Sequence, residues 1–434
     1  MGDSIGVSQF ERSQVNNIQL HLFPVKKFKT VTLLLMLQEQ LQPHSVTQTA
    51  LLPEVLKRGS ASYPTSQALR QRLDELYGAF FFADVLKRGE RHILQFYLDL
   101  PHQSFLAEHS PILRDAIALL GDVIQNPLSE EERFLDHYVE SAKESVRQRI
   151  ESLIDDKVHY AAERCIEAMC DAEPYGLPAH GRLQDLPSVD GGQLYWAHRQ
   201  ILQHHPIDLY VVGDLSLADV ERWVEATFTV PRSELRSFGQ AQVQRHVERV
   251  KVVVDEMEVA QGKLNLGLRT GVTYADDDYP ALMLYNGILG GFAHSKLFVH
   301  VREKASLAYY ASSRIESLKG IMTIQSGIEV SNYEKALAII KQQLDAMRQG
   351  DISPDEIEQT KAVMINQLRQ TYDRASSIVD ADYLGRLALR ERPLPQLIEE
   401  LGDVSKEEIQ SVAQKVRLDT VYFLRDQSKG GNAV

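Results

Sequence analysis

The sequence contains few of the residue patterns that hydrolytic enzymes use. It has no HExxH or HxxEH pair for zinc, no GxxxxGK phosphate loop and no CxxC. His198, His204 and His205 cluster in HRQILQHHP and offer imidazoles for a metal, but His204 and His205 stand at an expected helix end, where cationic side chains favour the dipole. His294 and His300 are six residues apart, a spacing that does not bring two imidazoles onto one helical face. The histidines therefore predict no metal site.

The two cysteines predict a reducing compartment. Cys165 and Cys170 lie on one expected helix, about 140° apart around its axis, so they do not easily bridge each other. The first residues, MGDSIGVSQFERSQ, lack the basic and apolar regions of a secretory signal. The longest apolar run, over residues 31–37, is far shorter than the roughly 20 residues that span a bilayer, and it indicates a buried strand. We expect a cytoplasmic protein with no membrane association.

Composition and charge are those of a globular protein. The chain has 434 residues, 44% of them hydrophobic, with 47 Lys and Arg against 60 Asp and Glu. The net charge of -13 repels phosphate backbones, and no basic cluster offsets it, so nucleic acid is not an expected partner. At roughly 150 residues per domain, the length allows two or three domains.

The two halves of the chain repeat one order of elements at a shift of about 225 residues. In the first half, the pattern predicts a strand over 92–100 and an amphipathic helix over about 105–125. A helix start follows, with Ser129 as N-cap and Glu132 completing a capping box. The long helix that begins there is expected to run to about Met169.

The second half shows the same series. Residues 321–330 predict the strand and residues 333–349 the amphipathic helix. Ser353 is the expected N-cap of the next helix, with Pro354 at the first helical position, where its missing N–H costs nothing. This helix is expected to run towards Leu389.

The repeat predicts an α+β chain made of two tandem homologous α/β domains. The segment 209–228 indicates a strand, a turn, an N-cap and a helix that close the first domain. We therefore expect a first domain over 1–228 and a second over 247–434. Between them, residues 229–246 contain Pro, Ser, Gly and Gln without a sustained apolar period and indicate a linker.

Four segments resemble the insulinase, pitrilysin and mitochondrial-processing-peptidase superfamily of inverzincins. They cover residues 51–101, 174–189, 211–228 and 279–313, and the last, YPALMLYNGILGGFAHSKLFVHVREKASLAYYASS, is the most specific. The resemblance implies the fold of that superfamily, in which each domain is a mainly antiparallel sheet packed with helices. Within this superfamily, the chain resembles a zinc-less, YmfF-like branch from Gram-positive bacteria.

The positions that resemble the zinc motif lack its ligands. In active members, HxxEH supplies two ligand histidines and a glutamate base, and a downstream glutamate is the third ligand. Here the first histidine position holds Ala50, the base position Pro53 and the second histidine position Glu54. The third-ligand position falls on Arg149, although the neighbouring Glu144 and Glu151 leave that register open. The resemblance thus implies no metal in this chain; a stand-alone enzyme with unusual ligands such as Glu54 is the weakest hypothesis.

The second half keeps its part of the family pattern. Family members carry an Arg and a Tyr seven residues apart, which reach the substrate at the zinc from the second domain. Arg302 and Tyr309 match both positions, and Ser306 stands where the family usually has Gly. The resemblance implies that the phenol donates to the scissile carbonyl as charge develops, while the guanidinium holds a substrate carbonyl or carboxylate.

A hydrophobic run in the first half lies where family members present an edge strand to an extended substrate peptide. It comprises Phe80, Phe81, Phe82 and Ala83. The resemblance implies β-augmentation here. Three core or interface phenylalanines are the alternative.

Loss of the zinc half-site with retention of the Arg and Tyr half-site suggests a subunit of a heterodimer. We expect a non-catalytic subunit that encloses a peptide chamber and supplies Arg302 and Tyr309 in trans. Zinc is then expected only on an HxxEH-bearing paralogue, this chain needs no cofactor of its own, and it can homodimerise when alone. The alternative is a proteolytically inactive scaffold or peptide-binding protein of the same fold.

Overall fold

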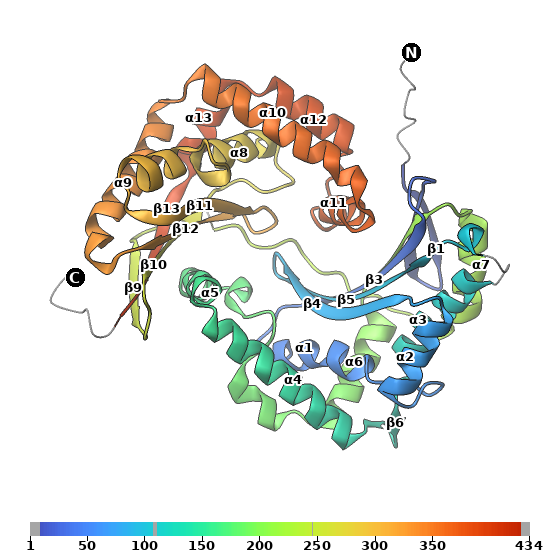
Figure 1. Ribbon diagram of the computed structural model, residues 1–434. Coiled ribbons are helices and arrows are strands. Elements are labelled where there is room, and N and C mark those ends of the chain that lie inside the picture. Colours follow the sequence, from blue (N-terminus) through green and yellow to red (C-terminus); the bar gives the residue numbers. More distant parts are fainter. Residues whose placement is uncertain (1–8, 107–110, 245, 427–434) are drawn as a thin grey trace, which may run out of the picture. The chain divides into compact units, whose positions relative to one another are not determined.

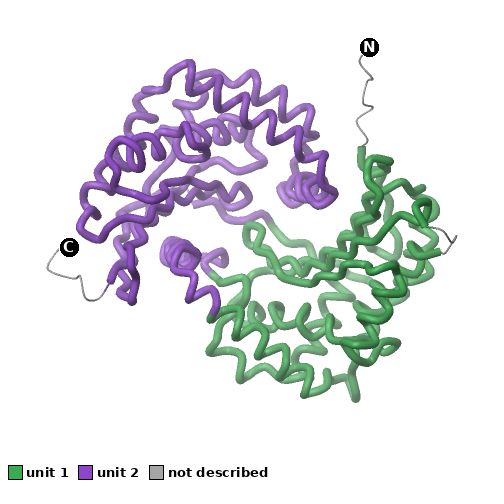
Figure 2. The backbone as a smooth tube through the Cα atoms, viewed as in Figure 1, with its two compact units in different colours: residues 1–151, 177–239 green, residues 152–176, 240–434 purple. Residues whose placement is uncertain are grey.

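The computed structural model describes residues 9–106, 111–244 and 246–426. The chain forms two compact units, each with its own hydrophobic core (Figures 1 and 2). Unit 1 comprises residues 1–151 and 177–239, and unit 2 comprises residues 152–176 and 240–434. The chain therefore leaves unit 1 near residue 151, returns near residue 177 and leaves it again near residue 239.

Unit 1 is built on a six-stranded sheet in which only one neighbouring pair, β2 and β8, is parallel. The apolar run at 31–37 lies in the long central strand β3, whose side chains are almost all buried, as predicted. In sheet order the strands are β1 (Glu11–Val15), β2 (Ile18–Pro24), β8 (Ile207–Gly213), β3 (Thr30–Gln40), β5 (Arg91–Pro101) and β4 (Phe80–Arg88).

Helices supply the rest of the unit 1 core. Among them, α1 packs against the edge of the sheet formed by β4 and β5. The helices are α1 (Val46–Leu56), α2 (Ser66–Glu75), α3 (Ile112–Gln125), α4 (Asp136–Asp155), α6 (Gly191–His204) and α7 (Leu217–Thr227). The expected unit over 209–228 is confirmed: the Ser216 side chain caps α7 by accepting from the backbone N–H of Asp219.

Unit 2 contains a five-stranded sheet, again with one parallel pair, β13 and β9. The order is β11 (Ala308–Glu316), β12 (Ile321–Ile328), β10 (Gly262–Arg269), β13 (Arg417–Arg425) and β9 (Lys251–Glu256). Its helices are α5 (Lys157–Met169), α8 (Tyr279–Asn286), α9 (Tyr333–Gln349), α10 (Pro354–Gln370), α11 (Ala375–Leu387), α12 (Leu394–Asp403) and α13 (Lys406–Lys415).

The two sheets share one topology, which confirms the predicted α+β fold of two mainly antiparallel sheets packed with helices. Strands β2, β8, β3, β5 and β4 of unit 1 have the same order and relative directions as β9, β13, β10, β12 and β11 of unit 2. Strand β1 is an addition to the first sheet. As a consequence, β4 and β11 occupy the equivalent edge of each sheet.

The predicted helix start at Ser129 is wrong. Ser129 pairs with Phe134 in a small hairpin of β6 (Ser129–Glu130) and β7 (Arg133–Phe134). The backbone turns back because Glu131 and Glu132 adopt left-handed φ values of 48° and 59°. The helix begins only at Asp136, at the start of α4.

Both long helices are interrupted. The first ends at Asp155, and the Asp156 side chain then caps α5. The second ends at Gln370 before α11 begins at Ala375. The second-half start is confirmed, since Ser353 and Glu356 form the expected capping box with Pro354 in the first turn.

In the described ranges, every helix is too short or too polar to cross a bilayer. The two compact units differ in extent from the domains expected from the sequence. Residues 152–176 pack with unit 2, and residues 229–239 pack with unit 1.

Candidate functional site

The helix at the expected zinc-motif position, α1, is almost entirely buried. Ala50 is a small buried side chain, and Pro53 lies inside the helix, where its missing N–H leaves the carbonyl of Thr49 without its helical donor. The carboxylate of Glu54 accepts from Nζ of Lys57 at 2.6 Å. The one oxygen ligand in this motif is therefore already paired with a cation.

The expected third-ligand residue, Arg149, is bound to a carboxylate. Its two terminal nitrogens donate to the two oxygens of Asp84 on β4, at 2.6 and 2.9 Å. This is the bidentate geometry that a guanidinium and a carboxylate favour. Glu144, one of the two acidic neighbours that left the register open, instead accepts from Arg147 and Gln148 on its own helix.

These residues do not fit a zinc ion. Alanine and proline side chains have no donor atom, Glu54 is engaged by Lys57, and a guanidinium at position 149 repels a cation. Nowhere in the described parts of the chain do three or more His, Cys, Asp or Glu side chains gather as a metal site would require.

Arg302 lies on the exposed side of an irregular helix in unit 2. This π-helical segment spans Phe298–Lys304, and the Arg302 guanidinium lies over the Phe298 ring at 4.5 Å from its centroid. Phe298 is four residues earlier in the chain, so one wide turn places the ring beneath the cation. The contact leaves the guanidinium exposed while limiting its conformations.

Tyr309 follows Arg302 at the beginning of β11, the edge strand of the unit 2 sheet, and its side chain is 60% exposed. The register between β11 and β12 shifts between Ala308 and Tyr310, so Tyr309 is the extra residue of a bulge. Ser306 begins this turn with a left-handed φ of 51°. A glycine would adopt this φ without steric cost.

The predicted peptide-binding strand is β4, and it forms an edge of the unit 1 sheet. Phe80 is 60% exposed and Phe82 is 43% exposed, while Phe81 packs against the core and Ala83 is buried. The alternation places the two exposed rings on one face of the strand, with the Phe80 ring edge-on to Tyr97 at 6.0 Å. Phe81 and Ala83 thus fit the alternative of core residues, whereas peptide binding at the exposed Phe80 and Phe82 stays a prediction.

Two contact partners of the candidate site residues were not predicted from the sequence: Phe298, which stacks with Arg302, and Asp84, which pairs with Arg149. Phe298 was detectable, because an aromatic side chain four residues before an arginine on a helix is a possible stacking partner. Asp84 was not, because its pairing with Arg149 joins residues 65 positions apart.

A family model described as "Peptidase M16 inactive domain" matches residues 188–364. The chain is 42% identical to the "Probable inactive metalloprotease YmfF" of Bacillus subtilis, over 95% of this chain and 97% of that protein. It is 26% identical to the "Uncharacterized zinc protease YmxG" of the same species, over 64% of this chain and 66% of that protein.

Solved structures show the same fold. A conserved protein from Enterococcus faecalis is similar with a TM-score of 0.89 and 32% identity, over 98% of this chain and all of that one. A peptidase M16 inactive domain from Pseudomonas fluorescens has a TM-score of 0.79 at 17% identity, over 96% of this chain and 98% of that one. The chain therefore belongs to the peptidase M16, or insulinase, family, as an inactive metalloprotease homologue.

Proposed function

We propose that this chain is the non-catalytic subunit of a two-subunit zinc metallopeptidase. It helps to enclose a peptide chamber and supplies Arg302 and Tyr309 to the zinc centre of an HxxEH-bearing paralogue. The zinc belongs to that partner, and the substrate is a peptide. Since Cys165 and Cys170 form no disulfide, we place the heterodimer in the cytoplasm.

One asymmetry supports the proposal. At the zinc-motif positions, the side chains either have no donor atom or are already held in ion pairs. Arg302 and Tyr309, in contrast, are exposed to solvent. Stacking on Phe298 restricts the Arg302 side chain, and the bulge in β11 sets the direction of Tyr309. Neither restriction is needed for a surface residue without a role. Exposed donors of this kind are suited to an oxygen on which negative charge develops.

The test combines the purified chain with its HxxEH paralogue and follows cleavage of a quenched fluorescent peptide library. Arg302→Ala and Tyr309→Phe should each lower kcat/KM by about 100-fold, because each removes one donor to the transition state. Arg314→Ala is the matched control, since Arg314 is exposed on the same strand, β11, and should leave kcat/KM unchanged. Unchanged cleavage in both test variants would overturn the proposal.

The second candidate is a proteolytically inactive scaffold or peptide-binding protein, and the exposed edge strand β4 favours it. An extended peptide can pair with the free edge and pack apolar side chains against Phe80 and Phe82. Under this hypothesis, Phe80→Ala with Phe82→Ala weakens peptide binding measured by fluorescence anisotropy. Phe105→Ala, at another exposed phenylalanine, should not weaken it. Peptide binding without cleavage in any mixture would favour this candidate. Separately, sedimentation analysis of the chain alone would show whether it homodimerises.

A further inference from the structure

Residues 152–176 come from the first half of the sequence but belong to unit 2 (Figure 2). Helix α5 packs on the second sheet, where Ala161 and Cys165 contact Tyr422 and Leu424 in one buried cluster. At its C-terminal end, Met169 lies over the bare backbone of Gly267, where a Cβ atom would come within 2.7 Å of the methionine sulfur. The segment 152–176 is therefore closely packed on the second sheet.

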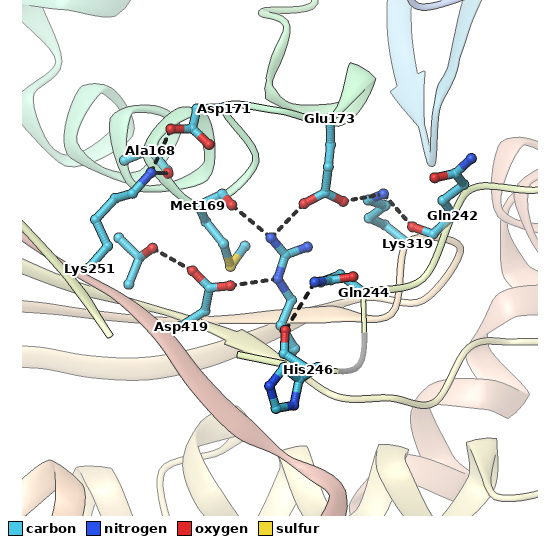
Figure 3. A network of polar contacts seen from close by, with 12 residues as sticks. Ala168, Met169, Asp171, Glu173, Gln242, Gln244, His246, Lys251, Lys319 and Asp419 are labelled. Carbon is cyan, nitrogen blue, oxygen red and sulfur yellow. Dashed lines mark hydrogen bonds and ion pairs between the residues drawn. The ribbon is translucent and has the colours of Figure 1, made fainter. Parts of the chain in front are cut away.

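A network of ion pairs and hydrogen bonds holds the C-terminal end of this segment (Figure 3). Glu173 accepts from Nη2 of Arg269, the last residue of β10, at 2.6 Å. The same Arg269 nitrogen donates to the carbonyl of Met169 at 2.7 Å, and its Nε donates to Asp419 on β13 at 2.9 Å. The Arg269 side chain is only 3% exposed, so this contact joins three segments in a largely dry environment.

The second oxygen of Glu173 binds another buried cation. Nζ of Lys319, in the turn between β11 and β12, lies 2.5 Å from this oxygen, and the lysine side chain is fully buried. The same Nζ donates to the backbone carbonyl of Gln242 at 2.5 Å. Val243 lies beside the same turn, 3.1 Å from where a Cβ of Gly320 would be. Lys319 thus holds the end of the 152–176 segment and the start of the chain that enters unit 2 after Gly239.

The charges of this network depend on one another. The carboxylates of Glu173 and Asp419 balance the cations of Arg269 and Lys319, and the two cations hold the pKa of Glu173 below its usual value despite its burial. Removal of one partner leaves a buried charge without compensation, which costs far more than loss of a surface ion pair. Glu173 is the shared member, since both cations bind it.

We propose that this network is a clamp that fixes two passages of the chain between the units, near residues 176 and 239, to unit 2 at once. Rearrangement between the units is then taken up at the residues just outside the clamp, and the segment 152–176 moves with unit 2. This inference concerns the mechanics of the fold and does not rest on the proposed function.

The test is hydrogen exchange measured by mass spectrometry on the full chain. Glu173→Gln keeps the shape of the side chain but removes its charge, so both passages should loosen together. Peptides covering 170–177 and 239–244 should each exchange about tenfold faster or more, while those of β3 and β5 keep their rates. Lys319→Met should accelerate exchange in the same two peptides.

The matched control is Asp171→Asn. Asp171 lies two residues from Glu173 but is exposed and pairs with Lys251 at 2.6 Å, so the 239–244 peptide should keep its wild-type rate. Faster exchange in only one passage, equal acceleration throughout β10, β12 and β13, or no change would overturn the clamp. If Glu173→Gln does not fold, Glu173→Asp, which keeps the charge on a shorter arm, is measured against the same criteria.

Discussion

Ser306 occupies a backbone conformation that costs a residue with a Cβ about 1 kcal/mol or slightly more. Its hydroxyl recovers little of this, because the contact to the carbonyl of Glu303 is long, at 3.3 Å, and exposed. We therefore expect Ser306→Gly to raise the free energy of unfolding by about 0.5 kcal/mol, after the greater entropy of glycine in the unfolded chain is subtracted. The measurement is the urea midpoint at constant m-value.

The control for this substitution is Ser312→Gly in the interior of β11. Ser312 is also exposed but lies in extended strand backbone, where glycine is unfavourable. The midpoint should fall in this variant. A fall in both variants would show that Ser306 is held by contacts that outweigh its strain.

The ion pair between Arg149 and Asp84 joins two elements, α4 and β4. Asp84 is more buried than its partner, with 14% of its side chain exposed against 38% for Arg149. Arg149→Gln should therefore cost about 1 kcal/mol, after allowance for solvent screening of the exposed guanidinium. Asp84→Asn should cost a similar amount, and the double variant should cost less than the sum, as a urea-based double-mutant cycle would show.

Arg147→Gln is the control for this cycle, because Arg147 is exposed on the same helix and its 3.5 Å contact to Glu144 is a surface pair. It should change the free energy of unfolding by less than about 0.5 kcal/mol. Strict additivity of the Arg149 and Asp84 substitutions would show that their contact does not stabilise the packing of α4 on β4.

Local patterns predicted the elements of this fold better than their ends. The capped start at Ser353 was predictable because its capping box involves residues only three apart. The same reasoning failed at Ser129, where three consecutive glutamates resemble a helical first turn but two of them form a left-handed turn. The topological equivalence of β4 and β11 was foreseeable only as a repeat, since strand order depends on contacts between distant segments. The lack of zinc-binding side chains at Ala50 and Pro53 was evident from residue types, whereas the partner of Arg149 required the fold.

At the scale of the whole molecule, those described histidines that have strongly lowered pKa values lie in unit 1. Burial lowers the pKa of His92 to about 3 and the pKa values of His198 and His205 to about 4. The imidazoles of His198 and His205 each face a backbone carbonyl, of Ile124 and Gln38, at 2.8 and 3.0 Å, and are neutral in the folded protein at pH 7. In unit 2, burial lowers the pKa of His300 more modestly, and the lowered pKa of Glu173 matters only below about pH 4.5.

We therefore expect acid to destabilise unit 1 before unit 2. Between pH 6.5 and about 4, these three imidazoles bind up to three protons in unfolded unit 1 that they do not bind in the folded unit. Burial raises the pKa values of Glu39 and Asp99, so these two carboxyls bind protons more readily in the folded unit and offset part of the difference. The contribution of the histidines to stability is fully present above pH 6.5 and is lost as the pH falls towards 4, by at most about 4 kcal/mol per pH unit. The chain carries a reporter for each unit, because both tryptophans, Trp196 and Trp223, lie in unit 1 and both cysteines lie in unit 2.

Urea unfolding at pH 7.5 and pH 5 should be followed by tryptophan fluorescence for unit 1 and by reaction of the buried thiols for unit 2. The fluorescence midpoint should fall at pH 5, while the thiol midpoint changes much less, because His300 is the one described histidine of unit 2 with a lowered pKa, and its pKa is lowered more modestly. His198→Gln should reduce the pH dependence of the fluorescence midpoint by about a third. The exposed His137→Gln should leave that dependence unchanged. Equal shifts of both reporters would mean that the two units unfold as one cooperative body, and a fluorescence midpoint independent of pH would mean that the buried imidazoles do not govern unit 1.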